Sequence, residues 1–419
     1  MTMSFLRRAA LSTACLLALA QSASAQAVAG LWDAVVVANK VEVPFQLEIA
    51  VTGTQAQGFF FDGDRRIGST SGSFRGGMLK LDYDFLNTTL EATLTGDELH
   101  GTYGADRPGA RRMEFRAAPF KPAAATAGDV PQLAGSWLMY HTAPDGSKLD
   151  VSWRLYLRQS AGEFSGAILK TSGDTGTLVG RWSNGRLTMS HFAGERPLVF
   201  EAQPNADGTL AITLDHGPTY IAAKTNEAVA KGIPAPPDLS RFTSVRNPEE
   251  PFHFSGVALD GRTISDADST FRGKVVVLTL GGTWCPNCHD EAPSLVEMYR
   301  QYHARGLEVV GLFLENDPQI DATRPRITSF VRRYAVPFPI VVAGGRDDGP
   351  SKFPQLVNFS VYPTTVILGR DGRVRNVHAG FASLATGDEH TRLETERREL
   401  VERLLAEPAP AGKVSASAR

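Results

Sequence analysis

Cysteine is scarce in this sequence. Three cysteines occur among 419 residues, and two of them belong to the single motif Cys285-Pro286-Asn287-Cys288. A structural disulfide framework uses several bridges spread through a small domain, which this chain cannot supply. A bridge from Cys285 to Cys288 encloses only two residues and restrains little of the unfolded chain, so it adds little stability. Redox chemistry is therefore the better explanation for the pair.

An excess of charge of one sign is also lacking. The chain has 43 Lys and Arg against 45 Asp and Glu, a net charge of −2, and no long basic or acidic run. Nucleic acids and anionic lipid surfaces select proteins with concentrated positive charge. We therefore expect neither as a partner.

No apolar run reaches the roughly 18 residues that a membrane-spanning helix needs. The run Ala9–Ala20 follows Arg7 and Arg8 and precedes Ala23-Ser24-Ala25. A positive end, a short apolar stretch and an A-x-A-like site are typical of a cleavable export signal. We expect cleavage near Ala25, a periplasmic location with secretion as the alternative, and no stable insertion in a membrane. Cys15 lies inside the apolar run, which argues against its lipidation. We expect cleavage of the signal to remove Cys15.

The region from about Gly30 to Tyr220 is rich in glycine and alternates apolar with polar residues, the pattern of strands with one buried face. It also repeats itself at an offset of 108 residues. The aligned apolar pairs are Val43 and Val151, Phe45 and Trp153, Leu47 and Leu155, and Ile49 and Leu157. We predict two all-β units of about 90 residues each, barrels or sandwiches, joined by the Pro/Ala-rich stretch Pro119–Pro131.

The sequence says little about what these repeats do. In the simpler interpretation their Trp and Phe residues fill two cores. In the other, these residues line a ligand pocket, as in lipocalin-like barrels. A dimerisation or docking role fits the pattern equally well.

Beyond the Pro-rich stretch Ile233–Pro248 the pattern changes to alternating strands and helices, typical of a sheet covered by helices. The expected strands are Phe252–Leu259, Lys274–Leu280, Leu307–Leu314, Val336–Ala343 and Thr364–Leu368, and the expected helices are Cys285–His303, Ile327–Tyr334 and Asp388–Leu405. The predicted order is a signal peptide (1–25), two β repeats (26–118 and 131–224), a linker (225–250), an α/β domain (251–406) and a disordered tail (407–419).

The CxxC motif follows a predicted buried strand and opens a predicted helix. Cys285 then stands at the helix N-terminus, where unpaired N–H groups and the helix dipole favour an anion and lower the pKa of the thiol. Only a thiolate attacks a disulfide, so Cys285 is the expected nucleophile, and Cys288 resolves the mixed disulfide. Pro286 fits the first helical turn, where its missing N–H is no loss.

These segments resemble a known family. Thr283-Trp284-Cys285-Pro286-Asn287-Cys288 with Glu291-Ala292-Pro293, and Tyr362-Pro363-Thr364-Thr365 ahead of Asp371-Gly372, are similar to the active-site segments of the TlpA/ResA-like branch of the thioredoxin superfamily. The resemblance covers about Phe252 to Leu405. It implies a thioredoxin fold and dithiol–disulfide exchange with partner proteins outside the cytoplasm, usually as a reductant. A membrane-associated electron donor or acceptor is the second partner that we expect.

The resemblance also implies supporting roles around the cysteines. Pro363 matches the family's cis-proline, which faces the cysteines and helps to dock an extended substrate segment. Trp284 matches the tryptophan that flanks the nucleophile. We expect Pro286, Tyr362 and Thr364 to support the same site.

Two positions depart from the pattern. Gly281-Gly282 stands where relatives commonly carry Trp-Ala, which we expect to open the cleft. Thr279 stands where thioredoxin has a buried Asp that assists proton transfer, and a hydroxyl cannot do so at neutral pH. Glu291 and Glu315 are the candidates for that task, with solvated or capping carboxylates as the alternative.

Three other chemistries share parts of the motif. Cys285-Pro286-Asn287-Cys288-His289 is also the attachment motif of c-type haem, but the flanking segments describe a thioredoxin domain in which we expect His289 on the surface. Two thiolates with His289 or His378 would suit Cu(I), although related copper proteins space their cysteines by three residues. A peroxidase would need Thr or Ser where Gly282 stands.

We therefore predict a multidomain protein in which a C-terminal α/β thioredoxin-like fold, a central sheet flanked by helices, follows two all-β repeats. Its predicted activity is thiol–disulfide exchange with protein substrates, as a protein-disulfide reductase. The redox-active disulfide Cys285–Cys288 carries this activity, without cofactor or metal. The alternative is a binding or scaffold module built on the β repeats, with an accessory redox or copper-handling CxxC domain.

Overall fold

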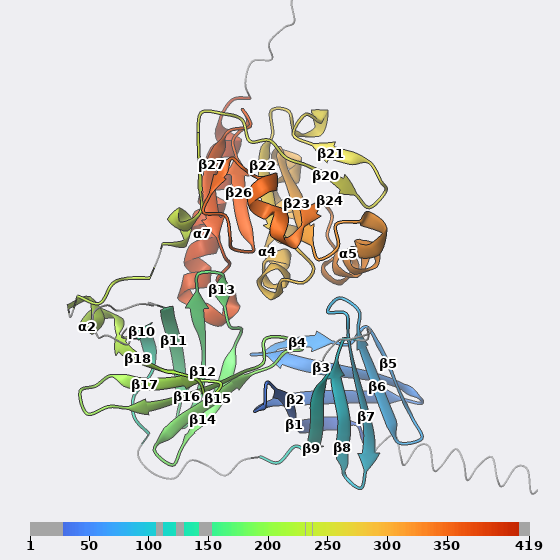
Figure 1. Ribbon diagram of the computed structural model, residues 1–419, viewed down its shortest axis with the longest axis vertical. Helices are drawn as coiled ribbons and strands as arrows, with labels where there is room; N and C mark the ends of the chain where they lie inside the picture. The colour runs from blue at the N-terminus through green and yellow to red at the C-terminus, as the bar shows by residue number, and fades with distance from the viewer. Residues whose placement is uncertain are drawn as a thin grey trace, which may run out of the picture.

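The computed structural model describes residues 28–105, 112–122, 130–141, 153–230, 232–236 and 238–409. The predicted signal peptide (1–25), Cys15 within it, and residues 410–419 of the predicted tail lie outside the described residues. Two β units and an α/β domain pack against one another (Figure 1). Among the described helices, none combines the length and the apolar character needed to cross a membrane.

The first β unit is a closed barrel. Eight of its nine described strands form a ring in the order β2-β1-β9-β8-β7-β6-β5-β3, which the pairing of β2 with β3 closes, and β4 adds to β3. The strands are β1 (Gly30–Ala38), β2 (Val41–Thr52), β3 (Gln55–Asp62), β4 (Arg65–Gly68), β5 (Ser71–Arg75), β6 (Met78–Tyr83), β7 (Thr88–Thr95), β8 (Glu98–Gly104) and β9 (Met113–Pro119).

The second β unit has the same topology. Its order is β11-β10-β18-β17-β16-β15-β14-β12, closed by β11 with β12, and β13 adds to β12. The strands are β10 (Gly135–Tyr140), β11 (Trp153–Ser160), β12 (Glu163–Lys170), β13 (Gly173–Asp174), β14 (Leu178–Ser183), β15 (Arg186–His191), β16 (Leu198–Pro204), β17 (Leu210–Leu214) and β18 (Thr219–Lys224). In both units an indole N–H donates to a carbonyl oxygen four residues earlier, Trp32 to Val28 and Trp137 to Leu133, each at 2.9 Å. The predicted pair of all-β repeats is confirmed.

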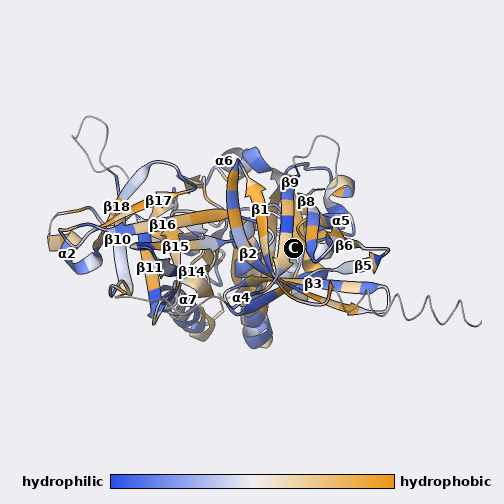
Figure 2. Cartoon of the chain, turned by 90° about the horizontal axis from the view of Figure 1, so that it is seen from below, coloured by the Kyte–Doolittle hydropathy of each residue, from blue (hydrophilic) through white to orange (hydrophobic). Residues whose placement is uncertain are grey.

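Aromatic side chains fill the barrel interiors. In the first barrel Trp32, Phe60, Tyr83 and Tyr103 are at most 2% exposed, and in the second Trp137 is 2% exposed. Hydrophobic and hydrophilic residues alternate along the barrel strands (Figure 2). These aromatic residues therefore belong to the cores, in agreement with the simpler interpretation of the sequence.

A loop of the second barrel joins the two barrels. Phe192, between β15 and β16, is 2% exposed and packs against Phe45 and Phe60 of the first barrel, with ring centroids 4.6 and 5.4 Å apart. The hydroxyl of Tyr103 donates to the carbonyl oxygen of Gly194 at 2.8 Å. Because the two barrels share an apolar core here, they form one body.

The C-terminal domain is built on a sheet with the strand order β21-β20-β24-β23-β22-β26-β27. Its strands are β20 (Ser255–Ala258), β21 (Thr263–Ser265), β22 (Val275–Gly281), β23 (Leu307–Glu315), β24 (Ile340–Gly345), β26 (Thr364–Leu368) and β27 (Val374–Ala379). Strands β22, β23 and β24 are parallel to one another. Helices α4 (Pro286–Tyr302), α5 (Ile320–Tyr334) and α7 (Asp388–Ala406) pack on one face, and aromatic loop residues such as Phe252 and Phe353 cover the other.

Three predicted boundaries in this domain differ by three residues or more from the observed ones. The strand predicted over Phe252–Leu259 is β20 and begins only at Ser255. Strand β24 begins at Ile340 rather than Val336, because Pro337 and Pro339 cannot donate to a ladder. Helix α5 begins at Ile320 rather than Ile327 and contains Pro325 in its second turn. The range predicted as linker holds α2 (Thr225–Ala230), α3 (Leu239–Phe242) and β19 (Ser244–Val245), and β19 pairs with β25 (Leu356–Val357). A four-residue helix, α6 (Gly349–Lys352), precedes β25.

Candidate active site

The register of the central strands brings the two motif segments together. Strand β22 ends at Gly281, and Cys285 is the N-cap of α4. On the neighbouring antiparallel strand β26, Thr364 lies opposite Leu280, so the preceding Pro363 reaches the level of the cysteines. The Tyr362–Pro363 peptide bond is cis, as predicted.

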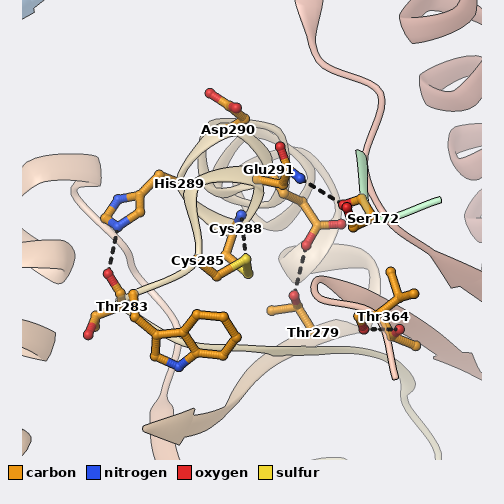
Figure 3. The surroundings of a disulfide bond; sticks show 12 residues. Ser172, Thr279, Thr283, Cys285, Cys288, His289, Asp290, Glu291 and Thr364 are labelled. Atoms are coloured by element: carbon orange, nitrogen blue, oxygen red, sulfur yellow. Dashed lines mark hydrogen bonds between the residues drawn. A yellow bond between two sulfur atoms is a disulfide. The ribbon is translucent and has the colours of Figure 1, made fainter. Parts of the chain in front are cut away.

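The two cysteines form a disulfide that is almost completely buried. Their Cα atoms are 5.2 Å apart, and Cys285 and Cys288 are 3% and 5% exposed. The backbone N–H of Cys288 donates to Cys285 Sγ at 3.3 Å (Figure 3). An N–H aimed at this sulfur, together with the helix dipole, favours a thiolate at Cys285 when the disulfide is open.

Trp284 covers one side of the motif. Its indole N–H donates to the carbonyl oxygen of Leu314 at 2.7 Å, its ring lies 5.3 Å from that of Tyr362, and the Arg346 guanidinium is 3.8 Å from its ring centroid. The Tyr362 hydroxyl donates to the carbonyl oxygen of Arg346 at 3.1 Å, and burial followed by the charge of Asp347 raises the pKa of Tyr362 to about 12. The site therefore has a rigid aromatic wall here.

The expectation that Gly281 and Gly282 open a cleft is wrong. A Cβ on Gly281 would lie 2.9 Å from Cys288 Sγ, and one on Gly282 would lie 2.8 Å from the carbonyl oxygen of Leu314 and collide with Trp284. The space that larger residues would occupy is already filled by the disulfide and the indole. The two glycines allow close packing rather than access.

Pro286 and Thr364 are the first residues of the two elements that follow the motif segments. Pro286 is the first residue of α4. Thr364 is fully buried, and its hydroxyl donates to the carbonyl oxygen of Val361 at 2.7 Å, which ties the cis-proline loop to β26.

Glu291 is buried directly behind the disulfide, and not solvated. It is 1% exposed and accepts hydrogen bonds from the hydroxyls of Thr279 (2.8 Å) and Thr365 (2.6 Å). Arg397 of α7, itself 4% exposed, donates to the same carboxylate at 2.9 Å. Three donors, one of them the positively charged Arg397, compensate the desolvation of this carboxylate.

Glu315 supports the segment that leads into the motif. Both carboxylate oxygens accept from Thr283, one from the backbone N–H at 2.7 Å and the other from the hydroxyl at 2.8 Å. The parallel register of β22 and β23 places Glu315 beside this segment. The geometry is that of a capping carboxylate.

His289 is buried, which corrects the expectation of a surface residue. It is 4% exposed, and its two ring nitrogens pair with the hydroxyl of Tyr334 (3.0 Å) and the carbonyl oxygen of Thr283 (2.9 Å). Burial lowers its pKa below the usual value. Because both nitrogens are engaged within the protein, His289 fits neither the axial ligand of a haem nor a ligand for Cu(I).

His378 is expected to make the stability of the domain sensitive to acid. Its side chain is 9% exposed, its Nε2 has no hydrogen-bond partner among the described residues, and burial followed by the charges of Arg397 and Arg392 lowers its pKa from 6.5 to about 4. The unfolded state therefore binds a proton below about pH 6.5 that the folded state takes up only near pH 4. As the pH falls from about 6.5 to 4, we expect the free energy of unfolding to decrease by about 3 kcal/mol. In His378→Gln the free energy of unfolding should depend less steeply on pH.

Chemical denaturation between pH 4 and 8 measures this dependence. The matched control is His253→Gln, because His253 has a side chain that is 69% exposed. Equal slopes for wild type and His378→Gln would contradict the prediction.

Three contacts between this region of α4 and the barrels were not predictable from the motif. Asn287, inside the motif, donates through Nδ2 to the carbonyl oxygen of Ser172 in the second barrel at 2.7 Å. Asp290, with a side chain 4% exposed, accepts from Arg65 of the first barrel (2.7 Å) and Arg196 of the second (2.8 Å). We call Arg65, Arg196 and Asp290 the Asp290 clamp.

Arg397 also went unrecognised, although the sequence carries a signal for it. The residue occupies the apolar stripe of α7, between the buried Leu393 and Val401. A charge in such a stripe predicts a buried partner. Nothing in the sequence indicates that Asn287 or Asp290 contacts the barrels.

The similarities to known proteins lie in the C-terminal part of the chain, which contains this site. A family model described as Redoxin matches residues 231–391. Thiol-disulfide oxidoreductase ResA of Halalkalibacterium halodurans is 30% identical over 132 residues, which cover 32% of this chain and 68% of that protein. ResA of Bacillus cereus is 30% identical over 116 residues, 28% of this chain, and the chain spans only 60% of the length of that relative.

Among solved structures, a thiol:disulfide interchange protein of Chlorobium tepidum TLS is similar to this chain with a TM-score of 0.30 and 23% identity, over 39% of this chain and 99% of that one. The Redoxin match spans both Cys285 and the cis-proline Pro363. The chain therefore belongs, through its C-terminal domain, to the TlpA/ResA-like family of the thioredoxin superfamily.

Proposed function

We propose that this chain is an exported protein-disulfide oxidoreductase that acts as a reductase. The observation that carries the proposal is the position of Cys285 as N-cap of α4, beside the cis-proline Pro363 and under an N–H from Cys288. Its expected location is the periplasm, with secretion as the alternative, and its partners are protein disulfides and a membrane-associated electron donor. The family membership and the names of the ResA relatives support this assignment.

The exchange takes two steps. In the dithiol form, the Cys285 thiolate attacks one sulfur of a substrate disulfide, forms a mixed disulfide and releases the first substrate thiolate. The Cys288 thiolate then attacks Cys285 Sγ, which re-forms the Cys285–Cys288 bond and releases the second substrate thiolate. Two electrons pass to the substrate, and a donor dithiol must return them before the next cycle.

Of the two candidate carboxylates, Glu291 is the better one to take the proton from Cys288. It lies three residues beyond Cys288 on the same helix, whereas Glu315 is the last residue of β23 and binds the Thr283 segment ahead of the motif. Arg397 donates to the Glu291 carboxylate at 2.9 Å and holds it in place.

The reduction potential of the Cys285–Cys288 pair tests the proposal. It would be measured on protein lacking residues 1–25, by alkylation and mass after equilibration in thiol buffers. We expect a value near or below about −220 mV, in the range of the reducing members of the superfamily. A value near about −120 mV would make the protein an oxidant, and a pair that does not cycle would overturn the assignment.

A further inference from the structure

The second barrel reaches into the disulfide site through residues 171–174, which comprise the turn after β12 and the two residues of β13 and are here called the β12–β13 turn. The carbonyl oxygen of Ser172 accepts from Asn287 of the motif at 2.7 Å (Figure 3), and the Asp174 carboxylate accepts from the backbone N–H of Ser383 at 2.5 Å. The loop that carries Ser383 is tied to the cis-proline, because the N–H of Gly380 donates to the carbonyl oxygen of Pro363 at 2.7 Å. The turn thus bridges the two segments that form the site.

The contact between the turn and this loop leaves no room for another chain. A Cβ on Gly380 would lie 2.7 Å from the carbonyl oxygen of Thr171 and 3.0 Å from the nitrogen of Gly173, and one on Gly173 would lie 2.8 Å from the carbonyl oxygen of Phe381. Both glycines have positive φ values, 74° and 121°, which few other residues adopt. Backbone packs directly on backbone, so a substrate segment can enter here only if the turn moves.

The Asp290 clamp holds the turn against the helix. Arg196 donates to Asp290 at 2.8 Å, to Asn287 Oδ1 at 2.7 Å and to the carbonyl oxygen of Asp174 at 3.0 Å, so one guanidinium joins α4 to the turn. Arg65 binds Asp290 at 2.7 Å and Asp62 at 2.6 Å. The Asp290 side chain is 4% exposed, so solvent and salt weaken these ion pairs little.

We propose that the β12–β13 turn is a specificity-determining element of the disulfide site, and that Arg65 and Arg196 are positioning residues that keep it closed. The inference rests on the proposed redox function. The turn obstructs the side of the disulfide formed by Asn287 and Gly380, where a protein partner would lay its chain. A small dithiol needs to reach only the sulfur atoms, so the turn does not slow its reaction.

A protein dithiol and a small dithiol reduce the disulfide by the same exchange reaction. A dithiol reduces the Cys285–Cys288 bond, is itself oxidised to a disulfide, and two electrons and two protons pass to the cysteine pair. Only the size of the dithiol differs. The ratio of the rate constant for a protein dithiol to that for a small dithiol therefore reports on the turn.

Stopped-flow reduction of the oxidised chain by dithiothreitol and by a reduced thioredoxin gives this ratio. We expect Arg65→Gln to raise it by about threefold or more, with the dithiothreitol rate constant nearly unchanged. The matched control is Arg66→Gln on the same strand, because Arg66 pairs with Glu48 of its own barrel at 2.8 Å and should leave the ratio at the wild-type value. Arg196→Gln, which acts from the other barrel, should raise the ratio as well.

Hydrogen exchange supplies a readout that does not depend on activity. We expect faster exchange in peptides containing residues 171–174 in Arg65→Gln but not in Arg66→Gln. An unchanged ratio with unchanged exchange would overturn the proposal, and so would equal acceleration by both dithiols. If the wild-type pair accepts no electrons from either dithiol, the proposed function itself fails, which is a different outcome from an unchanged ratio.

Discussion

Replacement of Cys285 by Ser is expected to slow the reduction of insulin disulfides to the rate seen without the protein. A serine hydroxyl does not attack a disulfide, and the remaining Cys288 thiol lies inside the first turn of α4, without the N-cap position that favours a thiolate at Cys285. Cys288→Ser is expected to stop turnover for a different reason. Its Cys285 thiolate still attacks, but the mixed disulfide has no internal thiol to resolve it.

The two variants therefore serve as controls for each other. Mass spectrometry of Cys288→Ser, incubated with insulin, should show a covalent adduct at Cys285, and Cys285→Ser should show much less. We expect this role for Cys285 because it is the N-cap residue that faces an N–H group, whereas Cys288 lies inside the first turn of α4. Adducts on Cys285→Ser alone would reverse the assignment of attacking and resolving residues.

Arg397→Leu is expected to destabilise the protein by about 3–5 kcal/mol, because it leaves the Glu291 carboxylate buried without its positive partner. The two side chains are 3% and 1% exposed and are 2.9 Å apart. Removing one member of such a pair costs more than removing both. The double variant Glu291→Gln with Arg397→Met should therefore recover most of the lost stability.

Urea denaturation of the oxidised chain measures this difference. Arg398→Leu is the matched control, since Arg398 is the next residue on α7 and is exposed, and it should change the free energy of unfolding by less than about 0.5 kcal/mol. If Arg397→Leu is as stable as this control, the Glu291–Arg397 pair does not stabilise the domain. If the double variant is no more stable than Arg397→Leu, the cost lies in packing rather than in the unpaired charge.

The sequence alone predicted the parts of the fold whose signals are local or repeated. Strand β26 was predicted at its observed bounds because an apolar run needs no knowledge of its neighbours. The two β repeats were recognised because the same alternation recurs 108 residues later. Strand β24 was misplaced because the apolar pattern runs through Pro337 and Pro339, which break the ladder without interrupting the pattern.

For the site, the sequence by itself determined the chemistry of the motif, since the order of strand, cysteine and helix is written along consecutive residues. It also placed the cis-proline, through a resemblance rather than a derivation. Only the tertiary structure decided the surroundings: His289 is buried, Glu291 is paired with Arg397, and Asp290 is held by the two barrels. Most of these contacts join residues from 45 to 225 positions apart. Each depends on desolvation and on the register of packed elements, which a local pattern does not encode.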